Sequence, residues 1–273
     1  MTLRTLIVTA VAAEADSVVR GLPFGGPGTG QGPEHGPGPE HGPGQEHGPG
    51  REHGPEPVEV PLPGGYVLRR HRHPAGAVVD VLVGGVGPAS VAAAAATALA
   101  AAATPYGLVV SAGIAGGFQP LAPIGSVVVS DAIVAADLGA QTPDGYLTVE
   151  ELGFGRSSHP VAAALTGRVS AALALGEPRH TVAPVLTVST VTGTAERAAE
   201  LAARHPGAAA EAMEGFGVAE AAAAHGVPVV EIRAVSNAVG PRDRAAWRIG
   251  EALDALRSTF QQLSHSVLVE PAP

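Results

Sequence analysis

Short apolar runs rich in Val, Ile and Leu alternate with segments of helical composition along most of the chain. The run 5–11 leads directly into a helical segment at 12–20, and the run 77–83 precedes another helical segment at 89–102. Strands that alternate with helices are typical of α/β folds, and antiparallel excursions make the sheet mixed. The alternation therefore predicts one domain over residues 1–273, a three-layer α/β/α sandwich with a central mixed sheet.

The same patterns predict the remaining elements. Strands are expected at 66–73, 108–111, 127–136, 181–191, 208–213 and 227–236, and helices at 160–175, after Thr194 as the N-cap, and at 245–263. The strand 127–136, which carries Asp131 and precedes Asp137, is expected to leave the main sheet. The last helix is expected to place its apolar positions in the core, namely Ile249, Leu253, Leu256, Phe260 and Leu263.

One stretch, residues 25–57, interrupts this alternation. Gly and Pro dominate it, and Glu-His-Gly-Pro recurs at Glu34, Glu40, Glu46 and Glu52. Such a composition cannot bury enough apolar surface to fold, so a disordered insertion is predicted. Its histidines offer either loose metal ligands or simply a solvated repeat. The second interpretation is favoured because the repeat lacks the short ligand spacings of a folded metal site.

The numbers of charged residues and cysteines limit the kinds of partner that the chain can bind. With 16 basic and 25 acidic residues the formal net charge is -9, which argues against nucleic acid as a partner. The absence of Cys excludes disulfides, thiolate catalysis and Cys-ligated metal. The first apolar run leads into charged residues without a cleavage region, and the Ala-rich run 91–103 is too short to span a bilayer. We therefore expect a cytoplasmic protein that does not bind membranes.

Polar side chains stand at the expected strand ends. Glu14 follows the first strand, Glu214 lies where a strand gives way to a helix, and Ser236-Asn237 ends the last strand. Ligands of α/β sheets bind at the edge where the carboxyl ends of the strands meet. These side chains therefore predict a site there for a ligand with hydroxyls and a polar ring. Considered alone, Glu14 is more typical of a carboxylate that stabilises the first turn of a helix than of a ligand-binding residue.

Two glycine-rich segments also follow strands, at 84–88 and 112–117, and both are expected to be turns. Such turns bring backbone amides close to a ligand. Neither has the spacing of a dinucleotide-binding or Walker motif, so no dinucleotide or nucleoside triphosphate site is predicted.

The order of these motifs resembles the purine nucleoside phosphorylase and nucleosidase superfamily. The resemblance covers the chain except for the insertion, and it is strongest to the methylthioadenosine/S-adenosylhomocysteine nucleosidase branch. Within that branch, the segment 233–244 together with Trp247 is similar to the futalosine hydrolase family. The resemblance implies a nucleoside phosphorylase-like fold, a small nucleoside substrate, no cofactor, no metal, and a homodimer or larger homo-oligomer.

The resemblance also implies roles for individual residues. Cleavage of an N-ribosidic bond passes through an oxocarbenium-like sugar and needs a carboxylate to position water. Glu14 corresponds to that carboxylate, Glu214 to the one that accepts from the ribose hydroxyls, and Met213 to a residue packed on the sugar. The further substrate-binding candidates are Ser111, Ala112, Gly113, Thr192, Gly193 and Ser236.

Asn237 departs from the adenine-specific nucleosidases, which carry Asp at this position to protonate the five-membered ring of the leaving base. An amide cannot supply that proton, but it offers both a donor and an acceptor, which suits a 6-oxopurine. Polar groups left unpaired by the wrong base cost roughly 1–3 kcal/mol each. Asn237 therefore points to hypoxanthine, the base of futalosine, a nucleoside of an alternative menaquinone pathway.

Two further features bear on the substrate. Related phosphorylases hold phosphate with arginines near the glycine turns, and neither turn here contains a basic residue, so water is the expected nucleophile. Futalosine carries a benzoate, for which Arg242 and Arg244 are candidate cations. An Arg242–Asp243 ion pair is the alternative for Arg242. A methylthioadenosine nucleosidase, a purine nucleoside phosphorylase and a non-catalytic purine-binding protein remain as alternative functions.

Overall fold

The computed structural model describes residues 3–22, 57–74, 76–174 and 176–270, and a ten-stranded sheet runs through its centre. The strands follow the order β11-β10-β6-β12-β5-β1-β4-β3-β2, with β9 paired to β6. They are β1 (Arg4–Thr9), β2 (Val58–Pro61), β3 (Val67–Arg72), β4 (Val78–Val83), β5 (Leu108–Gly117), β6 (Val127–Ala135), β9 (Ser158–Pro160), β10 (His180–Thr187), β11 (Ala210–Ala212) and β12 (Val229–Ala238). Parallel and antiparallel pairs both occur, so the predicted mixed sheet is confirmed.

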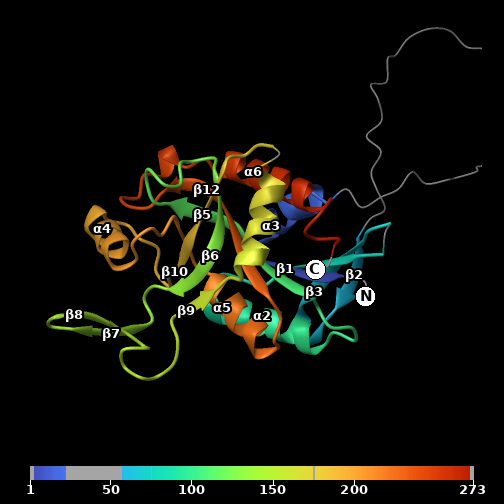
Figure 1. The fold of residues 1–273 in the computed structure, drawn as a ribbon, viewed down its shortest axis with the longest axis horizontal. Coiled ribbons are helices and arrows are strands. Elements are labelled where there is room, and N and C mark those ends of the chain that lie inside the picture. The colour runs from blue at the N-terminus through green and yellow to red at the C-terminus, as the bar shows by residue number, and fades with distance from the viewer. Residues whose placement is uncertain (1–2, 23–56, 75, 175, 271–273) are drawn as a thin grey trace, which may run out of the picture.

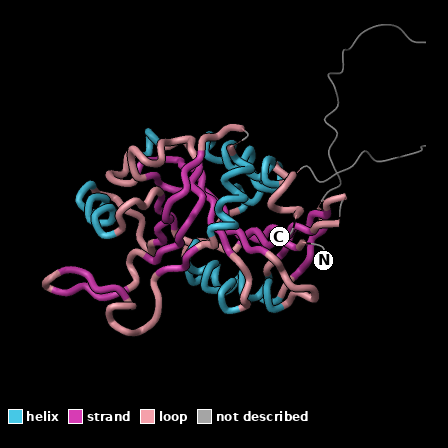
Figure 2. Tube along the Cα trace, viewed as in Figure 1, coloured by secondary structure: helices cyan, strands magenta, loops and turns pink. Residues whose placement is uncertain are grey.

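Helices cover both faces of this sheet (Figure 1). One layer contains α1 (Ala12–Arg20), α3 (Ala163–Leu173) and α6 (Ile249–Leu263), with α6 in contact with both others. The other layer is the pair α2 (Pro88–Ala100) and α5 (Gly215–Ala224). Figure 2 shows the strands between these two groups of helices, which confirms the predicted three layers.

The smaller elements lie around these layers. The helix α4 (Ala195–Arg204) begins after the N-cap Thr194, whose side chain accepts a hydrogen bond from Arg197 N, as predicted. The strands β7 (Gly139–Thr142) and β8 (Gly145–Thr148) form a separate hairpin that projects from the body (Figure 2). Two 3₁₀ turns are η1 (Pro63–Gly65) and η2 (Arg244–Ala246).

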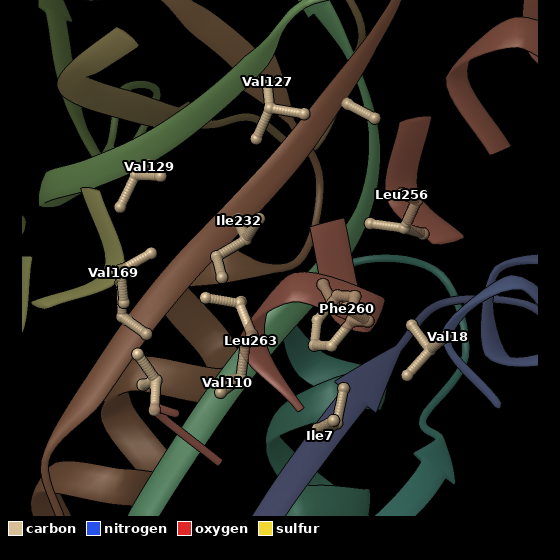
Figure 3. Close-up of a cluster of buried hydrophobic side chains, with 14 of the residues drawn as sticks. Ile7, Val18, Val110, Val127, Val129, Val169, Ile232, Leu256, Phe260 and Leu263 are labelled. Atoms are coloured by element: carbon tan, nitrogen blue, oxygen red, sulfur yellow. The ribbon is translucent and has the colours of Figure 1, made fainter. Parts of the chain in front are cut away.

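The hydrophobic core explains why the strands are apolar on both faces. Ile7, Val110 and Ile232 point from neighbouring strands toward Leu256 and Phe260 of α6 (Figure 3). On the opposite face, a second set of strand side chains packs against α2 and α5, including Leu6, Val8 and Val109 against Val91 and Val218. A strand buried on both faces has no polar alternation, which is the pattern of the apolar runs.

One end of the sheet closes on itself. β11 pairs in parallel with β10 and antiparallel with β5, where Ala210 faces Gly117 and Glu211 faces Gly116. The strands β5, β12, β6, β10 and β11 therefore form a ring. This closure brings the segment after β11, with Met213 and Glu214, beside the carboxyl-terminal halves of β5 and β12.

The segment 112–117 is not a turn, contrary to the prediction. β5 continues through it to Gly117, paired with β12 on one side and β11 on the other. Its glycines are required by close approach: a Cβ atom at Gly113 would lie 2.5 Å from Arg233 Nη1 and 2.6 Å from Glu14 Oε1. Glycine inside a strand can mark such an approach rather than a turn.

Two other expectations are also wrong. β6 does not leave the sheet but lies between β10 and β12, because Val127, Val128 and Val129 are fully buried there. Ile249 is not in the core, since it stands at the first position of α6 and is 43% exposed. The predicted insertion at 25–57 lies, except for its last residue, outside the described residues. Within the described ranges, no helix has the length and hydropathy needed to cross a membrane.

His71 of β3 makes the stability of the fold depend on pH. It is 6% exposed, and no described residue forms a hydrogen bond with its Nε2. Burial and the charge of Arg69 lower its pKa to about 4, although Asp80 acts in the opposite direction. As the pH falls, His71 therefore takes up a proton at a higher pH in the unfolded chain than in the folded chain. The free energy of unfolding consequently decreases as the pH falls from about 6.5 toward 4.

Replacing His71 with Leu should remove this part of the pH dependence. Between pH 7.5 and pH 5.0 the wild type is expected to lose about 2 kcal/mol more unfolding free energy than the His71→Leu variant, at about 1.4 kcal/mol per pH unit. Urea unfolding at the two pH values measures the difference. The control is His225→Leu, because His225 is exposed. Equal losses in the wild type and His71→Leu would contradict the assignment.

Candidate active site

Glu14 lies at the carboxyl end of β1, in the first turn of α1, and is 4% exposed. Its Oε2 accepts hydrogen bonds from the backbone N–H groups of Ala10 (3.0 Å) and Val11 (3.2 Å), and its Oε1 accepts from Ile114 N (2.9 Å). The carboxylate therefore bridges from its own helix to β5. Three backbone amides fix the position of the Glu14 carboxylate. A carboxylate that only stabilised the first turn of its helix would not need the contact with β5.

Glu214 approaches the same place from the other side of β5. It lies between β11 and α5 and is 6% exposed. Its Oε1 accepts from Gly87 N (3.2 Å), in the glycine turn that follows β4. The glycine turn after β4 therefore brings a backbone amide into the site. Among the described residues, this amide donates to the Glu214 carboxylate.

Arg233 of β12 connects the carboxylates. The side chain is fully buried, and its Nε donates to Glu231 Oε1 at 2.7 Å while Nη2 lies 3.2 Å from Glu214 Oε2. Burial by itself lowers the pKa of Arg233, but Glu231, Glu214 and Glu14 outweigh it and raise the pKa above its ordinary value. The guanidinium therefore remains charged among three carboxylates. We call Glu14, Glu214, Glu231 and Arg233 the carboxylate cluster.

Glu231 is the innermost member of the carboxylate cluster. Its side chain is fully buried, and its Oε2 has no hydrogen-bond partner among the described residues. Burial raises its pKa to about 7, and the charge of Arg233 acts in the opposite direction. Gly215 faces this carboxylate, and any side chain there would collide with it. Glu231 therefore acts as a fixed support for Arg233.

Ser111 and Gly113 complete the β5 side of the carboxylate cluster. Arg233 Nη2 donates to Ser111 Oγ at 3.3 Å, and Gly113 leaves the space that the side chains of Glu14 and Arg233 fill. Ala112, between them, points to the other face and packs in the hydrophobic core. Alternation along the strand thus brings Ser111 and Gly113 to the site and turns the Ala112 side chain away.

A cavity of about 80 Å³ lies further along β5 and contains the Asn237 side chain. Ser236 Oγ donates to Asn237 Oδ1 at 2.8 Å, and Asn237 Nδ2 donates to the carbonyl oxygen of Ala238 at 3.0 Å. Thr192 also lines this cavity, whereas Gly193 lies at its margin beside Arg242. Gly116 lines this cavity and lies three residues beyond Gly113 on β5, so the cavity and the carboxylate cluster contact the same strand.

Arg242 and Arg244 occupy different positions. Arg242 lines the cavity, 5.5 Å from the centre of the Trp247 ring, while Arg244 lies 6.0 Å from that ring and is not among the residues that line the cavity. Asp243 forms no ion pair with Arg242; its carboxylate instead accepts from Ala245 N at 3.1 Å. The alternative of an Arg242–Asp243 ion pair is therefore wrong.

The sequence analysis missed Arg233, Glu231 and Glu211 as site residues. Arg233 and Glu231 stand two residues apart in an otherwise apolar strand, so they share one face of β12. A charge pair within a fully buried run needs partners and is a sign of function or of a polar network. Met213, which was predicted, is half-buried beside Glu214, with its N–H 3.3 Å from Glu214 Oε2.

The size of a cavity does not identify the active site. A larger cavity, of about 390 Å³, lies at the amino-terminal edge of β1 and β4 and is lined by Arg4, Arg70 and Arg72. Two of these arginines pair with the buried Asp80. No member of the carboxylate cluster reaches that edge. The chemistry of the carboxylate cluster and of the Asn237 cavity therefore marks the carboxyl-terminal edge as the candidate active site.

This fold, with carboxylates held at the carboxyl edge of a mixed sheet, defines an α/β enzyme of the phosphorylase superfamily, whose family profile matches residues 45–269. The chain is 54% identical over 265 residues to a futalosine hydrolase of Streptomyces coelicolor, covering 96% of this chain and 95% of that protein. It is 41% identical over 263 residues to a futalosine hydrolase of Acidothermus cellulolyticus, covering 96% and 91%. The chain therefore belongs to the futalosine hydrolase family, as the motif order predicted.

Solved structures agree on the architecture. The futalosine hydrolase of Helicobacter pylori superposes with a TM-score of 0.73, covering 96% of this chain and 98% of that one at 14% identity. At this identity the likeness bears on the fold alone. It confirms the predicted nucleoside phosphorylase-like fold.

Proposed function

We propose that this protein is an N-glycosyl hydrolase that cleaves the N-ribosidic bond of futalosine, releasing hypoxanthine and dehypoxanthine futalosine. The observation that carries the proposal is the pairing of two arrangements along β5. Glu214 pairs with Arg233, the side chains of Arg233 and Glu14 both fill the space beside Gly113, and the Asn237 cavity contacts the same strand at Gly116. The identity to futalosine hydrolases over nearly the whole chain supports the same substrate.

In the proposed reaction Glu14 is the general base. Water attacks the anomeric carbon, its oxygen forms the new bond, and its proton passes to the Glu14 carboxylate. The bond to the base nitrogen breaks, and the departing base takes the electron pair. The base then gains a proton from solvent water, and Glu14 returns the proton it took to solvent, so neutral hypoxanthine leaves and the carboxylate is restored. Oriented bases of this kind contribute typically 10²–10⁴-fold to a rate. The three backbone amides on Glu14 hold it in one orientation for this proton transfer.

Glu214 and the charge of the carboxylate cluster serve the sugar. Glu214 accepts hydrogen bonds from the ribose hydroxyls in this proposal, and Met213 packs on the ring. Three carboxylates with one guanidinium give the carboxylate cluster an excess of negative charge. Fixed negative charge in a dry site stabilises the positive charge that develops on an oxocarbenium-like sugar. Water is the proposed nucleophile, since neither glycine-rich segment carries a cation for phosphate.

Asn237 faces the five-membered ring of the base. Ser236 donates to its Oδ1, which fixes the orientation of the amide. An amide holds a 6-oxopurine through its donor and its acceptor but cannot protonate adenine as a carboxylic acid can. This distinction supports futalosine over methylthioadenosine as the substrate.

Arg244 is our proposed partner for the benzoate of futalosine. Arg242 and Arg244 have no carboxylate partner among the described residues, but only Arg242 lines the Asn237 cavity. Arg244 is exposed and lies 6.0 Å from the centre of the Trp247 ring, so its guanidinium is open to a carboxylate of the substrate in this proposal. An exposed guanidinium matches a carboxylate bidentately.

Assembly and cellular role follow as further parts of the proposal. Leu138 and Leu147 at the projecting β7–β8 hairpin are 43% and 37% exposed, and Phe154 beyond it is 83% exposed. Exposed apolar side chains such as these support an interface between copies, so we infer a homo-oligomer. We also propose that the enzyme works in the cytoplasm and that its product feeds menaquinone biosynthesis.

The test is release of hypoxanthine from futalosine in phosphate-free buffer, with methylthioadenosine and inosine as parallel substrates. We expect release from futalosine at a rate that does not change when phosphate is added. The product should be the free sugar, without ribose 1-phosphate. Release that depends on phosphate would identify a phosphorylase instead. A preference for methylthioadenosine would show that Asn237 does not select the base.

A further inference from the structure

Glu211 of β11 has no role in the mechanism above, yet it lies in the same cavity as Asn237. Its side chain is 6% exposed, and its Oε1 and Oε2 accept from Thr192 N (2.8 Å) and Thr192 Oγ1 (2.5 Å). Burial raises the pKa of Glu211, while the hydrogen bonds from Thr192 act in the opposite direction. A buried carboxylate with lone pairs left over gains stability from any further donor placed in the cavity.

Arg242 supplies a positive charge to the same cavity. Its guanidinium forms no ion pair or hydrogen bond with any described residue and lies near the face of Trp247. Arg242 lies on the segment after β12 and lines the same cavity as Glu211, so the cavity combines a fixed acceptor with a donor that has no partner among the described residues. Glu211 and Arg242 are the two charged side chains that line the cavity, beside the polar side chains of Thr192, Asn237 and Trp247.

We propose that Glu211 and Arg242 select the leaving base by its six-membered ring, with Glu211 accepting from N1–H and Arg242 donating to O6. The inference rests on the proposed function, in which Asn237 holds the five-membered ring. Once that ring is fixed, the six-membered ring must turn its polar edge toward the remaining polar side chains. A carboxylate and a guanidinium match the donor and the acceptor of a 6-oxopurine.

The same pair rejects a 6-aminopurine. Adenine presents an acceptor at N1, which would face the Glu211 carboxylate, and a donor amino group, which would face the Arg242 guanidinium. Both contacts are mismatched. Glu211 is buried, and a site that leaves a buried polar group unpaired discriminates far more strongly than one that only adds or removes a methylene group.

Binding of the free bases tests this assignment without relying on turnover. Calorimetry with hypoxanthine and adenine is carried out on the wild type, Glu211→Gln and Arg242→Met. We expect the wild type to favour hypoxanthine by at least about 100-fold. Each variant should reduce that preference at least about tenfold, because each loses one of two matched contacts. The kcat/KM ratio for futalosine and its 6-amino analogue should move in parallel.

Arg248→Met is the matched control, because Arg248 follows Trp247 directly, is exposed, pairs with Glu251 and does not line the cavity. Its preference between the free bases should stay at the wild-type value. Thermal unfolding confirms that each variant is folded, and Arg242, on an exposed segment, provides a test independent of β11.

A preference that stays within about threefold of the wild type in Glu211→Gln or Arg242→Met would overturn the assignment of that residue. If Glu211 only supports Thr192, both bases should lose affinity equally and the ratio should not change. Failure of the proposed function itself has a different signature, since the wild type would then release no hypoxanthine from futalosine.

Discussion

The Glu14→Gln variant is expected to bind hypoxanthine normally but to hydrolyse futalosine about 10²–10⁴ times more slowly, the range for loss of a positioned general base. The Glu14 carboxylate is held by three backbone amides and lies beside Arg233 across Gly113, so the isosteric amide fits the same space. It cannot take the proton of the attacking water. The effect should therefore appear in kcat, measured by steady-state release of hypoxanthine, with little change in KM.

The control for this experiment is Glu196→Gln, an exposed carboxylate in the first turn of α4. Its kcat should equal that of the wild type. Hypoxanthine affinity and thermal unfolding of Glu14→Gln show whether a loss of rate reflects chemistry or a disturbed site. A kcat within a few-fold of the wild type would exclude Glu14 as the base.

Arg233→Met is expected to produce the largest loss of stability, about 3–5 kcal/mol of unfolding free energy. The guanidinium is fully buried and pairs with Glu231 at 2.7 Å and Glu214 at 3.2 Å. Removing it leaves two buried carboxylates without their counter-ion, and the energetic cost comes from these uncompensated charges. Urea unfolding at pH 8 measures the loss, and we also expect turnover to disappear because the carboxylates no longer hold their arrangement.

The double variant Arg233→Met, Glu231→Leu separates charge from packing. Because it removes the innermost carboxylate as well, it should recover a substantial part of the lost stability, but not the activity. Arg197→Met is the control, since Arg197 forms an ion pair with Glu200 on the surface of α4, and such pairs contribute about 0–1 kcal/mol. If Arg233→Met were as stable as Arg197→Met, the carboxylate cluster would have no structural role.

Local patterns in the sequence predicted most of the elements because they depend on neighbouring residues. The helix Ala12–Arg20 and the N-cap Thr194 are as expected, since apolar periodicity and capping residues are local signals. The prediction of a turn at 112–117 was wrong for the same reason, because it also rested on the local sequence alone. Nothing local distinguishes a glycine needed for a turn from one that makes room for Arg233 and Glu14 across the sheet.

Some residues of the candidate site can likewise be recognised from the local sequence, and others cannot. Glu14, Glu214 and Asn237 are recognisable in the sequence because each is a polar residue that follows an apolar run. Arg233 and Glu231 look like interruptions of a strand, and their role is visible only where β12 lies against β5. Glu211 joins the Asn237 cavity only because β11 pairs with both β10 and β5.

By itself the sequence determined the alternation of strands and helices, the family, and the polar residues at the carboxyl ends of the strands. Tertiary structure decided which of these residues meet: Glu14 with Ile114, 100 residues apart, and Glu214 with Gly87, 127 residues apart. The physical reason is that such contacts depend on strand order and on the closure of the ring. These are set by packing of the whole sheet against its two helical layers, and no short segment encodes them.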